Sequence, residues 1–331
     1  MPRDAFRRLG RLAGALLLLA AGASAQAQPA AEPGYPGRPI KLIVPYPPGA
    51  ITDVAARLIA EKMGPILGQP VVVDNRGGAG TRIGMQLVIS SPADGYTLLF
   101  ANSVTHGSMP AMAKSLPFDS LKDFVPVAAL FEYANLFVCN MSVPANNVQE
   151  LIAYARQNPG KLSNATAGPG SGHDLLGAMF KTMTGTDILH VHYKGAGPAL
   201  QDVLAGQVSC IWGDGNAKQH LEAGKLKAFA TAGTQRDPVF PTVPTMDEAG
   251  VKGFSLPIHQ GLAAPAGTPP AIVARLNAAT NEALKNPALL QRAKELGLVI
   301  LGGTPERQGT IMRDDITKFT KIVDDAHIEK E

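Results

Sequence analysis

The chain has 331 residues, of which 45% are hydrophobic and 5% aromatic, with 30 basic and 27 acidic side chains. A chain of this length exceeds what one hydrophobic core usually organises, so two domains are expected. The small excess of positive charge comes from the amino terminus, and no later basic run could follow a phosphate backbone, so nucleic acid is excluded as an expected partner.

The amino terminus has the pattern of an export signal. Basic residues precede an apolar run from Leu12 to Ala21, and two A-x-A sites follow, which allow cleavage after Ala25 or Ala27. The run is about ten residues, well short of the ~20 that span a bilayer as a helix, so we expect cleavage rather than anchoring. Loss of residues 1–27 as a signal peptide leaves 26 basic and 26 acidic residues, an electrically neutral exported protein.

From Ile40 onward, short apolar runs alternate with helical periodicity. Strands are predicted at Ile40–Val44, Val71–Val73 and Tyr96–Phe100. Between them, one helix is predicted to end at Gly68 and another to begin near Thr81. This βαβ rhythm is typical of a parallel sheet.

A second α/β unit follows the apolar run from Val125 to Val138. Its first helix is predicted at Val148–Gln157, where Asn147 and Glu150 have the spacing of a capping box. Further strands, each separated by a loop and a helical stretch, are predicted at Lys161–Ala165, Ile188–Val191, Ser209–Trp212 and Lys227–Ala230.

Beyond Gly261 the pattern is mainly helical, with helices predicted at about 270–285, 287–296 and 305–325. Helices without strong strands of their own are expected to cover the first sheet. We therefore expect a discontinuous first lobe of residues 28–132 and 260–331 and a second lobe of residues 133–259. Two such lobes create a hinge, and ligands usually bind between them.

Only two cysteines are present, Cys139 and Cys210, and both lie within apolar strand-like runs. An exported protein can form a disulfide, yet Cys also serves as a small core residue. We expect two buried free thiols, with a disulfide as the open alternative.

Three loops that follow predicted strands are rich in Gly, Ser, Thr and Pro, at residues 47–52, 166–173 and 194–198. Such loops expose backbone N–H groups at helix starts, where unsatisfied donors and the positive end of the helix dipole favour an anion. Any one of them is more often a plain turn. Several meeting at the crevice between two lobes favour a bound carboxylate.

The templates of nucleotide and catalytic sites are not matched. The phosphate-loop motif is absent, and His173 stands where a dinucleotide loop needs its third glycine. Ser171 lies in a near match to a nucleophile elbow, but Pro169 replaces one required glycine. His190 and His192 share one face of a predicted strand without a third ligand nearby, which favours core or cleft histidines over a metal site. We expect no enzyme activity, no cofactor and no metal.

A resemblance covers nearly all of the mature chain. The segments that carry it are Tyr35–Gly49, Thr52-Asp53, Gly68–Val73, Asn75-Arg76, Gly78–Gly80, Asp94–Leu99, Tyr193–Gly195, Pro198–Leu200 and Leu262–Pro269. In this order they resemble the Bug family of extracytoplasmic solute receptors, the TctC-like binding proteins of tripartite tricarboxylate transporters.

The resemblance implies an α/β, two-lobed periplasmic binding protein fold of type II, each lobe a mainly parallel sheet flanked by helices. It further implies a monomeric receptor in the periplasm that delivers a small carboxylate to the transmembrane permease subunits. By position, the resemblance points to Gly49, Ala50, Ile51, Thr52, Ser103, Thr105, His106, Thr166, Gly170, Ser171 and His173 as ligand-binding residues. We add Arg82, Tyr193, Asp214 and His259 as further candidates.

The chain departs from the usual pattern of this family in three places. Ala50 and Ile51 stand where Gly and Ser or Gly are common, Arg82 where Asn is common, and His259 near a usual aromatic residue. Ile51 makes its loop more apolar, while Arg82 and His259 offer charge or hydrogen bonds to a distal group. The hypothesis is a dicarboxylate with an aromatic or apolar body. The alternatives are a receptor that presents its ligand to a membrane sensor kinase and a secreted α/β hydrolase.

Overall fold

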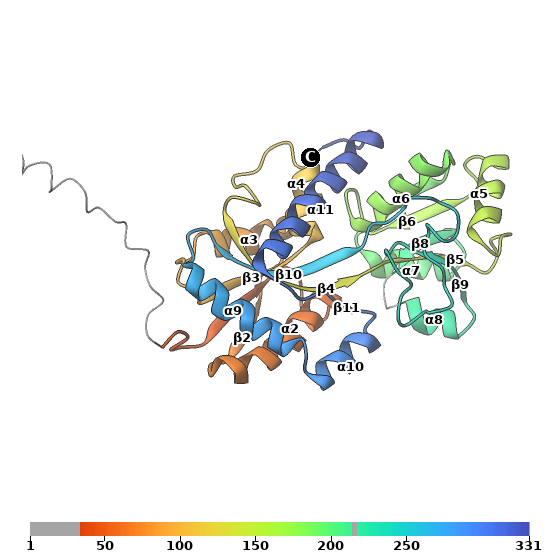
Figure 1. Cartoon of the computed structure of the whole chain (residues 1–331). Coiled ribbons are helices and arrows are strands. Elements are labelled where there is room, and N and C mark those ends of the chain that lie inside the picture. The colour runs from red at the N-terminus through yellow and green to blue at the C-terminus, as the bar shows by residue number, and fades with distance from the viewer. Residues whose placement is uncertain (1–33, 214–216, 331) are drawn as a thin grey trace, which may run out of the picture. The chain divides into compact units, whose positions relative to one another are not determined.

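The structure, a computed structural model, describes residues 34–213 and 217–330. The predicted export signal lies outside the described residues. Residues 34–331 form one compact unit, which contains two sheets flanked by helices (Figure 1). The two α/β lobes expected from the sequence are thus present.

The first sheet has six strands. Their order across the sheet is β11 (Val299–Ile300), β4 (Phe124–Tyr133), β10 (Ile258–Pro265), β3 (Thr97–Asn102), β1 (Ile40–Val44) and β2 (Val71–Asn75). Strand β1 runs parallel to β2 and β3, whereas β10 is antiparallel to both β3 and β4.

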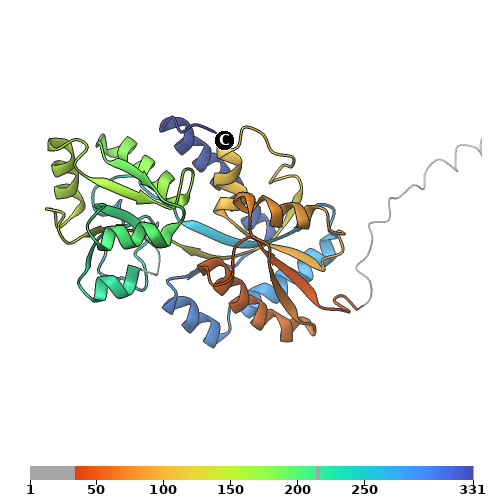
Figure 2. The same ribbon diagram turned by 180° about the vertical axis from the view of Figure 1, so that it is seen from behind.

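The second sheet has five strands and forms a separate layer, green in Figure 2. Their order is β7 (Leu189–His192), β6 (Ser163–Thr166), β8 (Cys210–Gly213), β5 (Leu136–Asn140) and β9 (Leu226–Thr231). Strand β6 is parallel to β7 and β8, whereas β5 is antiparallel to β8 and β9.

Both sheets are therefore mixed rather than mainly parallel as expected. Strand β4 carries the chain out of the first sheet toward β5, and β10 brings it back, side by side with β4 (Figure 1). A strand that leaves and a strand that returns along the same line are necessarily antiparallel. These two strands are the connection between the lobes.

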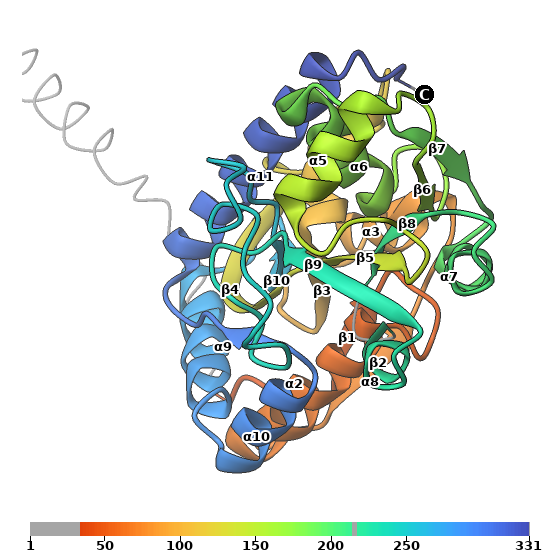
Figure 3. The same ribbon diagram turned by 90° about the vertical axis from the view of Figure 1, so that its right-hand side faces the viewer.

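Helices cover both faces of each sheet. Those of the first lobe are α2 (Ile51–Leu67), α3 (Arg82–Ile89), α4 (Met109–Met112), α9 (Pro270–Ala283), α10 (Pro287–Glu295) and α11 (Pro305–Asp325), with short turns at Ala79–Thr81 and Val104–Ser108. Those of the second are α5 (Val148–Gln157), α6 (Gly172–Thr184), α7 (Ala196–Leu204) and α8 (Lys218–Glu222). In the second lobe, α5 and α6 pack on one face of the sheet and α7 and α8 on the other (Figure 3).

The last helix also contributes to the core of the second lobe. The side chains of Phe319, Ile322 and Val323 on α11 belong to the same buried cluster as Phe137 and Trp212 of the second sheet. Burial of large apolar side chains is the main stabilising term in folding, so α11 joins the two lobes as a third connection besides β4 and β10.

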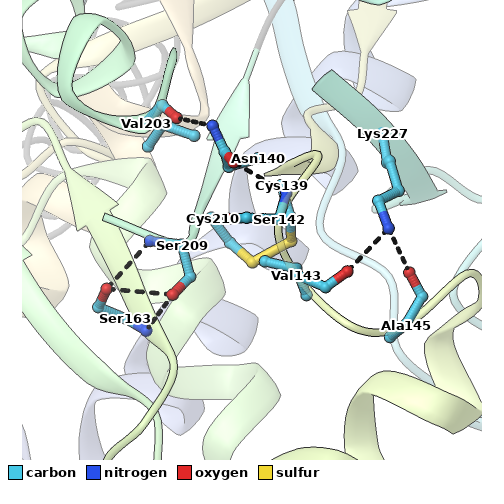
Figure 4. The surroundings of a disulfide bond; sticks show 10 residues. All are labelled: Cys139, Asn140, Ser142, Val143, Ala145, Ser163, Val203, Ser209, Cys210 and Lys227. Carbon is cyan, nitrogen blue, oxygen red and sulfur yellow. Dashed lines mark hydrogen bonds between the residues drawn. A yellow bond between two sulfur atoms is a disulfide. The ribbon is translucent and has the colours of Figure 1, made fainter. Parts of the chain in front are cut away.

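The prediction of two free thiols is wrong, because Cys139 and Cys210 form a disulfide (Figure 4). Strands β5 and β8 are antiparallel neighbours, and their register places the two cysteines directly opposite each other. Both side chains are fully buried. The bond closes a loop across a sequence separation of 71 residues, a pairing that depends on the sheet order and not on local sequence.

Candidate functional site

The first predicted anion loop connects β1 to α2. Gly49 has a φ of +88°, a left-handed conformation that favours glycine. Its N–H donates to Oδ2 of Asp53 at 2.9 Å, while the N-cap Ala50 provides no side-chain acceptor. The first-turn N–H groups of α2, which lack intrahelical partners, are therefore left for another acceptor.

Asp53 is buried and held by several donors. Arg57 donates from Nε at 3.1 Å and Asn75 from Nδ2 at 2.9 Å. Burial raises the pKa of the Asp53 carboxyl, but the hydrogen bonds from Arg57, Gly49 and Asn75 outweigh it, and the pKa is lowered. Of the predicted residues in this loop, Ala50 and Ile51 are half-buried and Thr52 is buried.

The second predicted anion loop connects β6 to α6. Gly168 and Gly170 have φ values of +125° and +68°, and the N–H of Gly170 donates to Oδ2 of Asp174 at 3.0 Å. Ser171 is the N-cap of α6, with its Oγ accepting the N–H of Asp174 at 3.3 Å. Thr166 is buried, with its Oγ1 2.8 Å from Nδ1 of His192.

A cavity of about 370 Å³ lies between residues of the two lobes. From the first lobe it is lined by Ala79, Gly80, Arg82, Val104, Ser108, Met109 and Met112, and from the second by Pro169 and Gly170. Its volume falls within the range of small-molecule sites. A larger hollow of about 490 Å³ at the carboxyl end of α2 shares no residue with either loop, so it is not the candidate site.

Arg82 is the only charged side chain among those that line the 370 Å³ cavity. Its Nε is buried and has no hydrogen-bond partner among the described residues. The preceding residues Ala79 and Thr81 have φ values of +46° and +80°. Backbone strain of this kind at non-glycine residues concentrates at ligand sites. In contrast to the charged Arg82, the side chains of Val104, Met109 and Met112 form an apolar wall of the cavity.

Ser103 and His106, which were predicted to contact the ligand, are buried and belong to a network of contacts around Asp315. Ser103 donates from Oγ to Asp315 at 2.6 Å, and Nε2 of His106 lies 3.3 Å from the same carboxylate. Nδ1 of His259 lies 2.8 Å from Asp315, and its Nε2 lies 3.7 Å from Glu132.

Thr105 is also buried, and its Oγ1 accepts the N–H of Asn102 at 2.9 Å and donates to the carbonyl of Asn102 at 2.7 Å. The hydroxyls and imidazoles of this region thus fix the turn at 104–108 and α11. Of the predicted stretch 103–106, only Val104 lines the cavity.

Asp315 was not predicted, although the sequence holds a signal for it. It continues the buried stripe of α11 that contains Gln308, Met312 and Phe319, and a carboxylate in such a stripe needs partners. Burial raises its pKa, but the hydrogen bonds from His106 and His259 dominate and lower the pKa of Asp315 to about 2.

The remaining predicted residues lie elsewhere. His173 lines a separate cavity of about 230 Å³ beside α7 and β8. Tyr193 donates its hydroxyl to Asp202 at 2.6 Å, and this hydrogen bond raises the pKa of Tyr193 to about 12. Asp214 lies outside the described residues. Met109, Met112 and Ser108 line the main cavity and were not predicted, since the sequence does not show that the chain turns there.

No cluster of three or more His, Cys, Asp or Glu side chains that could hold a metal ion occurs in the described part of the chain. His190 and His192 both lie near Asp174, with His190 Nδ1 2.7 Å and His192 Nδ1 3.8 Å from Oδ1. His190 is a hydrogen-bond partner of Asp174 in the first turn of α6, and His192 is one of Thr166 at the end of β6.

Two α/β lobes, a loop at a helix start in each, and a cavity lined by both lobes together define a two-lobed solute-binding protein. Residues 55–328 match the family model described as the tripartite tricarboxylate transporter family receptor, TctC. The chain belongs to this family, and its Bug-type resemblance is confirmed.

One relative and two solved structures are similar over most of the chain. The chain is 37% identical to Protein BugT of Bordetella pertussis over 299 residues, which is 90% of this chain and 92% of the relative. It is 34% identical to R. palustris Rpa4515 with adipate, with a TM-score of 0.79 and coverage of 89% and 99% of the two chains. It is 35% identical to MatC of Rhodopseudomonas palustris with bound malate, with a TM-score of 0.75 and coverage of 87% and 100%.

These relatives are solute receptors, so this chain is a periplasmic-type receptor and not an enzyme. Among the described helices, none combines the length and the apolar character that a membrane-spanning helix needs.

Proposed function

We propose that this receptor binds a small dicarboxylate with an apolar or aromatic body. One carboxylate is held by backbone N–H groups at the starts of α2 and α6, the body lies in the cavity between the lobes, and Arg82 binds the distal carboxylate. The observation that carries the proposal is the composition of the 370 Å³ cavity, an apolar wall with a single arginine.

The two loops support an anion at one end of this ligand. Gly170 belongs both to the loop before α6 and to the lining of the cavity. The loop at 49–52 does not line the cavity in this structure, so we propose that it reaches the ligand when the lobes close. A ligand that contacts both lobes favours the closed state in proportion to its extra contacts there.

Arg82 and the apolar wall of the cavity are the evidence for a distal carboxylate and an apolar body in the ligand. An arginine with a buried, unpartnered Nε gains a charge-assisted hydrogen bond when a carboxylate arrives. Met109 and Met112 can adapt their shape to an aliphatic or aromatic body. His259 is already engaged by Asp315 and Glu132, so the proposed distal contact no longer includes it.

The family membership supports the proposal that the receptor delivers its ligand to the transmembrane permease subunits of a tripartite transporter. The amino-terminal pattern of residues 1–27 supports export to the periplasm. Because two relatives of known structure were solved with adipate and with malate, a compact dicarboxylate is the first ligand to test.

Isothermal titration with adipate, terephthalate and hexanoate tests the proposal. We expect both dicarboxylates to bind more tightly than hexanoate, and Arg82→Ala to weaken adipate binding roughly tenfold to a hundredfold, the worth of a charged hydrogen bond. Arg292→Ala on the surface of α10 is the control, since Arg292 pairs with Glu295 at 2.8 Å and should leave affinity unchanged. Equal affinity for hexanoate and adipate would exclude a distal carboxylate.

A further inference from the structure

The two anion loops contain the same carboxylate arrangement. In each loop a glycine N–H donates to Oδ2 of an aspartate four residues later, from Gly49 to Asp53 at 2.9 Å and from Gly170 to Asp174 at 3.0 Å. Each aspartate is the third residue of its helix and is buried. Each loop is therefore positioned by a carboxylate directly behind the proposed anion site.

A carboxylate so close to an anion site needs a counter-charge. Asp53 has Arg57, whose guanidinium nitrogen lies 3.0 Å from its Oδ1. Asp174 has His190, whose Nδ1 lies 2.7 Å from Oδ1, with His192 at 3.8 Å. A guanidinium keeps its charge at all physiological pH values, whereas an imidazole gains or loses its charge between pH 5 and 8.

The His190 ring also borders the side chain of Asn164. Its Nε2 is buried without a hydrogen-bond partner among the described residues, and so are both amide atoms of Asn164. The parallel register pairs Asn164 with His190. A side-chain carbon added at Gly177 would lie within 2.8 Å of both groups, so the two are close. The Asn164 side chain can turn so that its Oδ1 accepts a hydrogen bond from a protonated Nε2.

We propose that Asp174 and His190 are the positioning pair of the second anion loop, and that its counter-charge is titratable where that of the first loop is fixed. This inference rests on the proposed anion site. Its consequence is that protonation of His190 strengthens the binding of an anionic ligand.

The sign of the pH dependence of ligand affinity follows from the charges of Asp174 and His190. With His190 neutral, the uncompensated charge of Asp174 lies one hydrogen bond behind Gly170 and repels an incoming carboxylate. Burial raises the pKa of Asp174, but the hydrogen bonds from His190 and Gly170 and the nearby imidazoles together outweigh it, so the pKa is lowered and Asp174 stays ionised at neutral pH. A free aliphatic carboxylate is also ionised above about pH 5.5. We therefore expect affinity to fall roughly fivefold to tenfold as the pH rises from 5.5 to 8.

Several other charged groups around α6, β7 and the helix α11 that packs on α6 are paired, while Lys318 of α11 interacts electrostatically with Asp315. These pairs are Lys181 with Asp187, Tyr193 with Asp202, Lys321 with Asp325 and Lys330 with Asp324. The charges that act on Asp174 are those of His190 and His192.

Adipate titrations between pH 5.5 and 8 test the inference in the wild type and in His190→Gln, which keeps a donor for Asp174 but cannot titrate. We expect the variant to lose most of the pH dependence. His327→Asn is the control, because His327 is exposed at a φ of +51° that Asn tolerates, and it should keep the wild-type slope. An unchanged slope in His190→Gln would overturn the inference.

A ligand-free measurement separates this inference from the proposed function. In ¹⁵N-glycine-labelled protein, the amide resonance of Gly170 should move between pH 5.5 and 8 in the wild type and stay fixed in His190→Gln, while that of Gly49 stays fixed in both. If adipate fails to bind but the Gly170 resonance shows this pH dependence, the role of Asp174 and His190 as positioning pair is supported and the proposed ligand is wrong. If the Gly170 resonance has the same pH dependence in the wild type and in His190→Gln, the positioning pair is refuted whether or not adipate binds.

Discussion

Gly170 has two separate reasons to lack a side chain. Its φ of +68° is a conformation that other residues adopt at a cost. A Cβ placed on it would also lie 3.0 Å from the terminal methyl of Met112, inside the cavity that both residues line. The backbone conformation and the space around this residue therefore both serve the site.

Gly170→Ala should weaken adipate binding by about tenfold, because the added methyl narrows the cavity and disturbs the N–H that Asp174 holds. Gly185→Ala is a matched control, since Gly185 has a φ of +60° at the end of α6 but no atom near its would-be Cβ. Both variants should lose similar stability, about 1 kcal/mol, measured by urea unfolding. Only the first should lose affinity, and equal affinities would remove Gly170 from the site.

For individual residues of the two loops, the sequence predicted the backbone conformation better than the side-chain hydrogen bonds. Glycine-rich loops after strands are visible in the sequence, and the loops at Gly49 and Gly170 are where they were expected. The aspartates behind them were not predicted, because an acidic residue in a first helical turn is common for its effect on the helix dipole alone. The hydrogen bond back to the glycine depends on the fold of each loop.

Among the elements, α11 has an internal charge that its neighbours must compensate. Asp315 receives hydrogen bonds from Ser103 and lies close to His106 and His259. These partners come from the turn after β3 and from β10, one of the two strands that connect the lobes. The carboxylate therefore fixes the helix to the connection between the lobes.

Protonation of the Asp315 carboxylate in acid should lower the stability of the folded protein. Its folded pKa of about 2 is below its ordinary value of 3.8, so its contribution to stability is present above pH 4 and is lost as the pH falls toward 2. The difference corresponds to roughly 2 kcal/mol. Asp315→Asn should lower the free energy of unfolding at pH 7 by about that amount and flatten its fall between pH 4 and 2.

Asp314→Asn, the exposed neighbour on the same helix turn, provides the comparison for this experiment. It should leave both the stability at pH 7 and the acid transition unchanged. If the two variants unfold alike in acid, the network around Asp315 contributes no net stability.

Elements defined by local signals were predicted closely. The helix at Val148–Gln157 has its capping residue Asn147, and α11 begins at Pro305 after the N-cap Thr304. Strand β10 was not predicted, because its place depends on β4 and β3, which are distant in the chain. Such long-range pairing also produced the mixed sheets and the disulfide.

For the whole molecule, the disulfide limits how far the unfolded chain can expand. Closing a loop across 71 residues reduces the entropy of the unfolded state by an amount worth about 4 kcal/mol. Replacing both Cys139 and Cys210 by Ala should lower the free energy of unfolding by up to this value in urea. Adipate affinity should be unchanged, because neither cysteine lines the cavity. A loss of affinity would instead connect the bond to the shape of the site.

The position of α11 has a consequence for the order in which this protein is made. The core of the second lobe needs Phe319 and Val323, which leave the ribosome long after the strands they cover. Until then the nascent chain lacks part of its main apolar cluster and stays below its full stability. The core of the second lobe is therefore completed only when α11 has been added to the chain, long after the strands of that lobe have been made.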